Sequence, residues 1–113
     1  MDDCLFCKII KGEIPSTKVY ENDYVYAFMD IAPQAPFHAV FVPKMHIGSP
    51  AEINAENSIY VAKIFEAISE VAKSENLEKG FRVVANCGED GGQTVGHLHF
   101  HLLARRYLQW PPG

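Results

Sequence analysis

The 113-residue sequence lacks the features that mark several classes of protein. No apolar run approaches the length of a membrane-spanning helix, about 18 residues, so we expect no membrane partner. No block of lysine or arginine stands out and the formal net charge is −4, which argues against a polynucleotide partner. Small anionic ligands are still compatible with this charge, because backbone amides and histidines can bind them locally.

Cysteine is also scarce. The sequence has 3 cysteines (Cys4, Cys7 and Cys87), and an odd number without a secretory signal argues against a disulfide framework. The first residues, Met1, Asp2 and Asp3, are acidic where a signal peptide would be basic. We therefore expect a cytoplasmic protein, or a nuclear one as well if the source is eukaryotic.

The composition is that of a globular protein, with 48% hydrophobic and 21% charged residues. We expect a single domain over residues 1–113 with one core. Hydrophobic periodicity predicts a short helix over 4–11 and a long amphipathic helix from Asn54 or Ala55 to Glu75. Segments rich in β-formers predict strands at 18–21, 24–29, 38–42, 81–85 and 97–103. This order predicts an α+β fold with a five-stranded antiparallel sheet.

Two further patterns refine these elements. The stretch 87–96 holds several glycines and is predicted to be a loop with unusual backbone angles. Residues three and four apart define the apolar face of the long helix: Ile59, Ala62, Ile64 or Phe65, Ile68, Val71 and Ala72.

The clearest chemical feature is a row of histidines. His97, His99 and His101 alternate with Leu98 and other apolar residues. Because successive residues of a strand point to opposite faces, the three histidines are predicted to share one face and the apolar residues to enter the core beneath the long helix. A run of surface histidines or an adventitious metal cluster is the alternative interpretation, which the alignment of the three and the glycine-rich loop before them disfavour.

Such a row suits substitution at phosphorus. A neutral imidazole is a nucleophile, and a second imidazole can donate or accept protons near neutral pH. Amides of a glycine-rich loop can hold phosphate oxygens without adding side-chain bulk. A histidine nucleophile would pass through a covalent phosphoramidate-type intermediate.

The row and its flanks, residues 92–103 (GQTVGHLHFHLL), resemble the signature of the histidine-triad (HIT) family of nucleotide hydrolases and transferases. Residues 4–15 resemble the opening of that family, 28–36 its nucleoside loop and 42–46 the strand end beyond. The final Trp-Pro-Pro-Gly, residues 110–113, is similar to the tail of the Hint branch rather than the Fhit branch.

The resemblance implies a role for each matching residue. His99 would attack the α-phosphorus, His101 would contact the phosphate and assist the leaving group, and His38 would support the nucleophile. Asp30 would accept hydrogen bonds from the ribose hydroxyls. The base pocket would comprise Ile31, Phe6, Ile9, Ile14, Phe28 and Val40, and the phosphate side of the site Asn86, Gly92, Gln93 and Thr94.

Two positions depart from the Hint pattern. Thr94 stands where serine is usual and keeps the hydroxyl, whereas Met29 stands where a histidine is common, so contacts near the ribose are expected to differ in detail. Without the resemblance, Asp30 would be interpreted as a turn-former, and Asn86 and Thr94 as caps of loop amides.

The pair Cys4 and Cys7 has zinc-binding spacing, but a structural zinc needs four ligands. His46 and His97 are the candidates for the other two, and some relatives in the family show a similar set. Two alternatives stay open: a structural zinc that ties the N-terminal helix to the sheet, or two reduced cysteines packed under the sheet with His46 exposed. No cofactor is expected for the chemistry itself.

The resemblance implies hydrolysis of purine nucleoside 5′-monophosphoramidates, which releases AMP or GMP and an amine. It also implies a homodimer in which two sheets join into one layer. Two alternatives are a dinucleoside polyphosphate hydrolase of the Fhit type and a purine-nucleotide-binding regulatory or scaffold protein whose hydrolysis is incidental.

Overall fold

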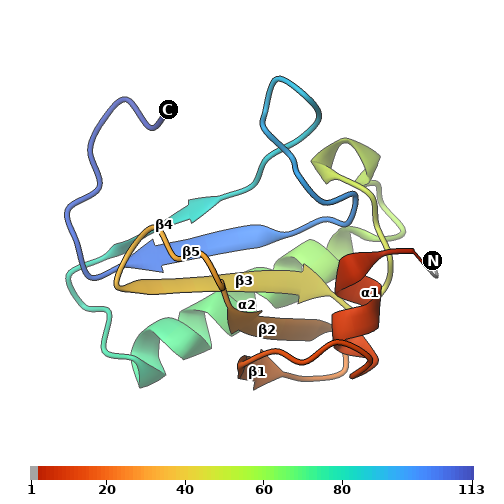
Figure 1. Ribbon diagram of the computed structural model, residues 1–113, viewed down its shortest axis with the longest axis horizontal. Helices are drawn as coiled ribbons and strands as arrows, with labels where there is room; N and C mark the ends of the chain where they lie inside the picture. The colour runs from red at the N-terminus through yellow and green to blue at the C-terminus, as the bar shows by residue number, and fades with distance from the viewer. Residues whose placement is uncertain (1–2) are drawn as a thin grey trace.

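The computed structural model describes residues 3–113, and its centre is a five-stranded antiparallel sheet in the order β1-β2-β3-β5-β4 (Figure 1). The sheet confirms the predicted fold class. Its strands are β1 (Lys18–Glu21), β2 (Val25–Met29), β3 (Phe37–Pro43), β4 (Phe81–Val84) and β5 (Phe100–Ala104). The helices are α1 (Leu5–Ile10) and α2 (Ser58–Ser74), with a 3₁₀ turn, η1 (Pro50–Glu52), before α2.

The two helices lie on opposite faces of the sheet, α2 behind it and α1 in front in the view of Figure 1. The larger core forms between the sheet and α2, where Leu98, Phe100 and Leu102 meet the buried face of the helix. The smaller cluster packs α1 residues against the other face of β2 and β3. Alternation along each strand thus supplies two apolar layers, and the histidine row lies on the α1 side.

The buried face of α2 differs in part from the prediction. Ile64, Ile68 and Val71 are buried as expected, together with Ala67. Phe65 is 47% exposed and Ile59 46%, because each residue turns the helix by about 100° and both positions lie well away from the line through Ile64 and Ile68. Phe65 still packs edge-on against Phe100, with 5.5 Å between ring centroids.

The fifth strand is shorter at its start than predicted, so His97 and His99 precede the ladder that His101 belongs to. At the start of β5, pairing begins with Phe100 opposite Phe41 of β3 and with His101 opposite Val84 of β4. Before that point the backbone finds other partners, since the Leu98 amide donates to the Ile47 carbonyl at 2.6 Å.

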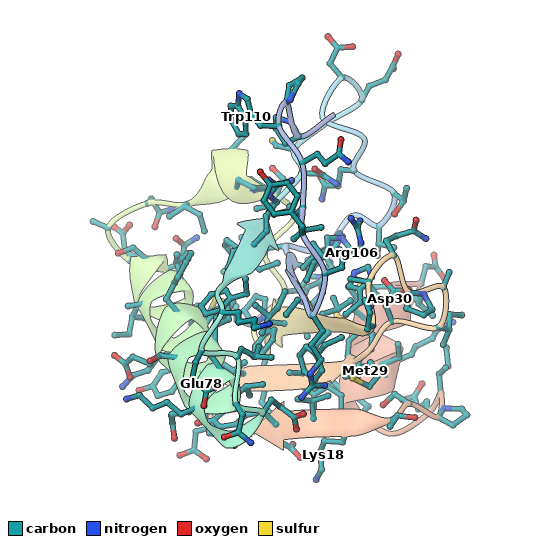
Figure 2. All side chains as sticks on the ribbon, turned by 90° about the vertical axis from the view of Figure 1, so that its left-hand side faces the viewer. Lys18, Met29, Asp30, Glu78, Arg106 and Trp110 are labelled. Carbon is teal, nitrogen blue, oxygen red and sulfur yellow. The ribbon has the colours of Figure 1, made fainter. Side chains whose placement is uncertain are left out.

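Two further features concern the rest of the chain. The segment after β5 forms no regular element, and Trp110 projects from it with 81% of its surface exposed (Figure 2). Among residues 3–113, neither helix combines the length and the apolar character that crossing a bilayer requires.

Candidate active site and metal cluster

A cavity of about 260 Å³ opens on the α1 face of the sheet. Helix α1 forms one wall, the end of β2 another, and the start of β5 the third. Figure 2 shows Met29 and Asp30 at the end of β2, where they border this cavity. The predicted site residues that line it are Phe6, Ile9, Ile14, Phe28, Asp30, Ile31, Val40, Thr94, His99 and His101.

Three predicted phosphate contacts, Asn86, Gly92 and Gln93, do not line the cavity. The amide of Gly92 donates to the Glu89 carbonyl and that of Gln93 to the Gly88 carbonyl, each at 3.0 Å. These amides therefore close the turns of their own loop and are not free to hold an anion.

The side chain of Gln93 stabilises that loop through hydrogen bonds to backbone carbonyls. Its amide nitrogen donates to the carbonyls of Gly48 and Val95 at 2.8 and 2.9 Å. Gly92 has a φ of 77°, a left-handed angle that favours glycine. The loop thus contributes Thr94 and Val95 to the cavity and uses its glycine-rich part for its own geometry.

The ring of His99 is fixed by the backbone two residues before it. Its Nδ1 lies 2.7 Å from the carbonyl oxygen of His97, and a carbonyl only accepts, so Nδ1 carries the proton. With the proton on Nδ1, the ring nitrogen that can offer a lone pair is Nε2. His99 is only 4% exposed and packs edge-on against Phe6 of α1, with 5.1 Å between ring centroids.

A chain of hydrogen bonds also fixes the proton of His101. The backbone amide of Gln34 donates to Nδ1 of His38 at 3.0 Å, so the neutral His38 ring carries its proton on Nε2. That Nε2 lies 2.8 Å from Nδ1 of His101 and donates to it. The proton of His101 is therefore on Nε2, and the histidine ring that His38 contacts is that of His101 rather than that of His99.

His38 and His101 are neutral at pH 7. Burial lowers the pKa of His101 to about 4, and the neighbouring rings of His99 and His38 act in the same direction. Burial also lowers the pKa of His38, while the charge of Asp30 opposes this shift. A neutral His101 with its proton on Nε2 is a hydrogen-bond donor at the cavity wall.

Asp30 makes a turn-forming contact and also lines the cavity. Its Oδ1 accepts from the Ala32 amide at 2.8 Å, which is the turn-forming contact. Its Oδ2 lies 3.4 Å from Nε2 of His38 and 3.9 Å from Nδ1 of His101. The carboxylate thus stands at the cavity edge beside the histidine chain, where a sugar hydroxyl can reach it.

The sequence analysis missed some of the lining residues: Leu5, Pro15, Ser16, Met29 as a wall residue, and Val95. All of them except Ser16 are adjacent in sequence to a predicted member. Chain neighbours of site residues were therefore the available signal for the other four.

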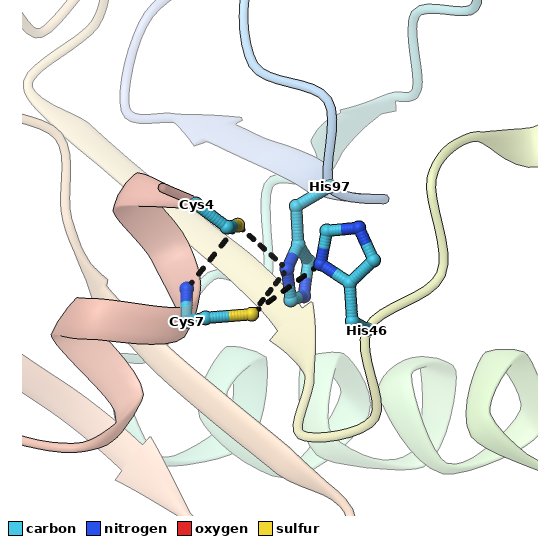
Figure 3. A group of neighbouring side chains, drawn as sticks. All are labelled: Cys4, Cys7, His46 and His97. Atoms are coloured by element: carbon cyan, nitrogen blue, oxygen red, sulfur yellow. Dashed lines mark hydrogen bonds between the residues drawn. The ribbon is translucent and has the colours of Figure 1, made fainter. Parts of the chain in front are cut away.

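A second cluster lies beside the cavity, with Cys4 and Cys7 of the α1 region facing His46 and His97 (Figure 3). Their donor atoms all lie within 4.8 Å of one another. Nδ1 of His97 is 3.3 Å from Sγ of Cys4 and 3.6 Å from Sγ of Cys7, and Nδ1 of His46 is 3.3 Å from Sγ of Cys7.

This donor set fits zinc. With Zn–S near 2.3 Å and Zn–N near 2.0 Å, tetrahedral geometry puts sulfur and nitrogen about 3.6 Å apart, close to the separations in the cluster. Nε2 of His97 donates to the Pro43 carbonyl at 3.0 Å, which leaves the lone pair of Nδ1 aimed at the two sulfurs. His97 is completely buried, and burial lowers its pKa to about 4, so the ring is neutral as a ligand must be.

A larger hollow of about 710 Å³ lies at the other end of the sheet, next to the tail. It is bordered by basic residues, but their guanidinium groups bind backbone carbonyls. Arg82 donates to the carbonyls of Leu108 and Gln109, Arg105 to that of Glu75, and Arg106 to that of Gln34. These arginines hold the tail in place.

Comparison with known proteins identifies the family. A family model described as "Scavenger mRNA decapping enzyme C-term binding" matches residues 3–109. The structure of a HIT family hydrolase from Legionella pneumophila aligns with a TM-score of 0.95 and 46% identity, over 98% of this chain and 100% of that chain. The chain belongs to the HIT family. The similarity that the histidine row suggested is therefore confirmed.

Two curated relatives add detail. Adenylylsulfatase HINT1 from Arabidopsis thaliana is 44% identical over 117 residues, which cover 96% of this chain and 76% of that protein. A 14 kDa zinc-binding protein from Brassica juncea is 45% identical over 119 residues, which cover 98% of this chain and 100% of that protein. The name of the first relative agrees with a family of hydrolases, and the name of the second agrees with the presence of a cluster that could hold a metal ion.

Proposed function

We propose that this HIT protein hydrolyses the P–N bond of purine nucleoside 5′-monophosphoramidates through a nucleotidyl-histidine intermediate. The observation that carries the proposal is the 2.7 Å contact between Nδ1 of His99 and the His97 carbonyl. It leaves Nε2 of His99 as an unprotonated nucleophile in a ring that lines the cavity. The cavity offers Asp30 for a ribose and an apolar wall for a base.

In the first step, Nε2 of His99 attacks the α-phosphorus while the bond from phosphorus to the amine breaks. The amine leaves with the electron pair of that bond and takes a proton from solvent. His101 donates a hydrogen bond from Nε2 to the phosphoryl group, and the hydroxyl of Thr94 is available to a second oxygen. The charge that develops on the phosphoryl oxygens is thus met by donors fixed before the substrate arrives.

In the second step, water attacks the same phosphorus and the bond to Nε2 of His99 breaks. The nucleoside monophosphate leaves, the proton of the water goes to solvent, and His99 regains its neutral state with the proton on Nδ1. The His38–His101 pair keeps its arrangement throughout, because the Gln34 amide holds His38 from behind. This scheme uses no metal for the chemistry.

The relative named adenylylsulfatase supports adenylyl groups as the part that is transferred. In that case the leaving group differs from an amine, while the attack on the α-phosphorus stays the same. The three substrate types to compare are therefore adenosine 5′-phosphoramidate, adenylyl sulfate and diadenosine polyphosphate. Faster turnover of the third would favour the Fhit-type alternative, and very slow turnover of all with tight AMP binding would favour the scaffold alternative.

The direct test is rapid quenching with adenosine 5′-phosphoramidate followed by mass spectrometry of peptides. We expect one added adenylyl group on His99 and none in a His99→Ala variant. An adduct on His101, or rapid turnover with no adduct and unimpaired activity of His99→Ala, would overturn the mechanism.

We also propose that Cys4, Cys7, His46 and His97 hold a structural zinc ion. A bound ion would tie α1 to the end of β3 and the start of the histidine row, and all four ligand positions would be filled by protein. The relative named as a zinc-binding protein supports this assignment. Metal analysis of the purified protein is the check, and a zinc-free protein with the Cys4–Cys7 pair intact would contradict it.

A homodimer is the third part of the proposal. Strand β4 is an edge of the sheet, and a hollow of about 510 Å³ runs between it and α2. Phe65 and Phe81 border that hollow and are each nearly half exposed. A second copy that paired along β4 would extend the sheet and cover both rings. Sedimentation should give a dimer for the wild type and a monomer for Phe81→Asp, whereas a monomeric wild type would refute this part.

A further inference from the structure

The polar residues that line the cavity are unevenly distributed. His99, His101 and Thr94 come from β5 and the loop before it, and Asp30 comes from the end of β2. One other lining side chain carries a hydrogen-bonding group, namely Ser16, which lies in the segment between α1 and β1. The remaining wall is apolar, so this serine has a distinct place in the site.

The register of the sheet places Ser16 away from the histidines. His101 pairs with Val40 and Val40 with Phe28, so these three form one row across β5, β3 and β2. Adjacent strands are about 4.8 Å apart, which puts Phe28 about 10 Å from His101. Ser16 bonds to Tyr26, which lies two residues before Phe28 on the same face, about 7 Å farther along β2.

A nucleotide whose phosphate meets His99 and whose ribose meets Asp30 has the apolar part of the cavity left for its base. Phe28, Ile9 and Ile14 belong to that part, and Ser16 lines the same cavity two residues after Ile14. An apolar slot of this kind binds the faces of a base but cannot recognise its edge. The hydroxyl of Ser16 is the side-chain group placed to do so.

The position of Tyr26 fixes the orientation of that hydroxyl. Oγ of Ser16 is 2.8 Å from the phenol oxygen of Tyr26, whose residue is only 8% exposed. Either hydroxyl can donate in this pair, and the phenol is the more acidic of the two, which favours Tyr26 as the donor and Ser16 as the acceptor. The hydrogen of the Ser16 hydroxyl is then free to be donated to a ligand, and the bond from Tyr26 polarises it.

We propose that Ser16, held by Tyr26, is the specificity-determining residue that donates a hydrogen bond to a ring nitrogen of the base. This inference rests on the proposed function, since it concerns the same cavity. It names the substrate class as a nucleotide with an acceptor nitrogen on the edge of its base, in contrast to a plain sugar phosphate. Tyr26 acts through Ser16 and is a positioning residue.

The test compares AMP with ribose 5-phosphate by calorimetry on the wild type, Ser16→Ala, Tyr26→Phe and the control Thr17→Ala. One neutral hydrogen bond contributes about 1 kcal/mol, so Ser16→Ala should weaken AMP binding about 3- to 10-fold. Binding of ribose 5-phosphate should not change in any variant. Tyr26→Phe should weaken AMP binding less than Ser16→Ala, and Thr17→Ala should leave it unaltered.

Deaza analogues of AMP identify the nitrogen. One of the 1-deaza, 3-deaza and 7-deaza analogues should bind the wild type as weakly as AMP binds Ser16→Ala, with no further loss in that variant. Equal AMP affinity in the wild type and Ser16→Ala, or an equal loss for ribose 5-phosphate, would overturn the inference alone. If the wild type bound no AMP, the proposed function itself would fail and the inference with it.

Discussion

The two side-chain clusters on the α1 face differ in what their histidines are free to do. In the cluster of Cys4, Cys7, His46 and His97 the donor atoms point at one another and enclose a single point. In the cavity next to it, His99 and His101 line an open space of about 260 Å³. The first arrangement suits a structural ion and the second a substrate.

The backbone decides this difference for His97 and His99, because one nitrogen of each ring is bound to a main-chain carbonyl. His97 uses Nε2 on the Pro43 carbonyl, so Nδ1 is left for the sulfurs. His99 uses Nδ1 on the His97 carbonyl, so Nε2 is left for the cavity. Two residues apart, the same side chain thus becomes a metal ligand or a nucleophile according to which nitrogen the backbone occupies.

The largest effect on activity should come from a substitution in the cavity rather than in the cysteine–histidine cluster. His99→Ala removes the nucleophile, and turnover of adenosine 5′-phosphoramidate should fall by about 10⁴-fold or more, as losing a nucleophile does in other hydrolases. AMP affinity should stay within a few-fold of the wild type, since Asp30 and the apolar wall remain. The measurement is steady-state kinetics together with calorimetry, and turnover above about a tenth of the wild type would remove His99 from its role.

A smaller effect should follow when the support of His101 is lost. His38→Ala frees Nδ1 of His101, so the ring no longer has one defined tautomer. We expect kcat to fall about 10- to 100-fold with KM nearly unchanged, because His38 does not line the cavity. His38→Asn, whose amide can also donate to His101, should recover part of the loss. An equal fall in His38→Ala and His38→Asn with a raised KM would indicate a merely structural role.

Metal removal should affect stability rather than chemistry. A zinc ion that binds only the folded chain at 100 times its dissociation constant contributes about 2.7 kcal/mol, so a chelator should lower Tm by roughly 10 °C. Cys7→Ser should show the low Tm with or without zinc. Cys87→Ser, which alters the exposed cysteine, should behave like the wild type. A wild-type Tm that changes with neither zinc nor chelator would contradict the proposal that this cluster holds zinc.

The smallest effect concerns pH. The pKa of His101 is about 4 in the folded protein, whereas an unfolded histidine titrates near 6.5. Between these two pKa values the unfolded chain binds a proton at His101 and the folded chain does not. Stability should therefore decrease as pH falls from about 6.5 to 4. In His101→Gln this decrease should be shallower, by roughly a few degrees of Tm. Identical slopes for both proteins, measured by thermal melts, would show that His101 does not titrate in this way.

Much of the fold could be predicted from the sequence because its signals are periodic and local. Strand alternation predicted that Leu98, Phe100 and Leu102 face the core and that the histidines face the other side. The spacing of Cys4 and Cys7 suggested half of a zinc site, with His46 and His97 as candidates for the other half, and the structure brings the four side chains together. The resemblance to the HIT family added Asp30 and the apolar wall, which single residues would not have indicated.

What could not be predicted depends on hydrogen bonds between distant backbone groups. The glycines near Gly92 suggested free amides, but the loop uses the Gly92 and Gln93 amides itself. Antiparallel pairing sets His38 opposite Leu103, and His101 lies two residues before Leu103. The ring of His38 therefore contacts that of His101. Ser16 gave no signal at all, since its role depends on a tyrosine ten residues away.

The tautomers of the histidines are the most direct test of this account. Long-range ¹⁵N–¹H correlation spectra of the imidazole rings at pH 7 report which nitrogen of each ring carries the proton. We predict the proton on Nδ1 for His99, on Nε2 for His101 and on Nε2 for His38. A His99 ring protonated on Nε2, or one that averages between both forms, would contradict the claim that the backbone prepares this residue as the nucleophile.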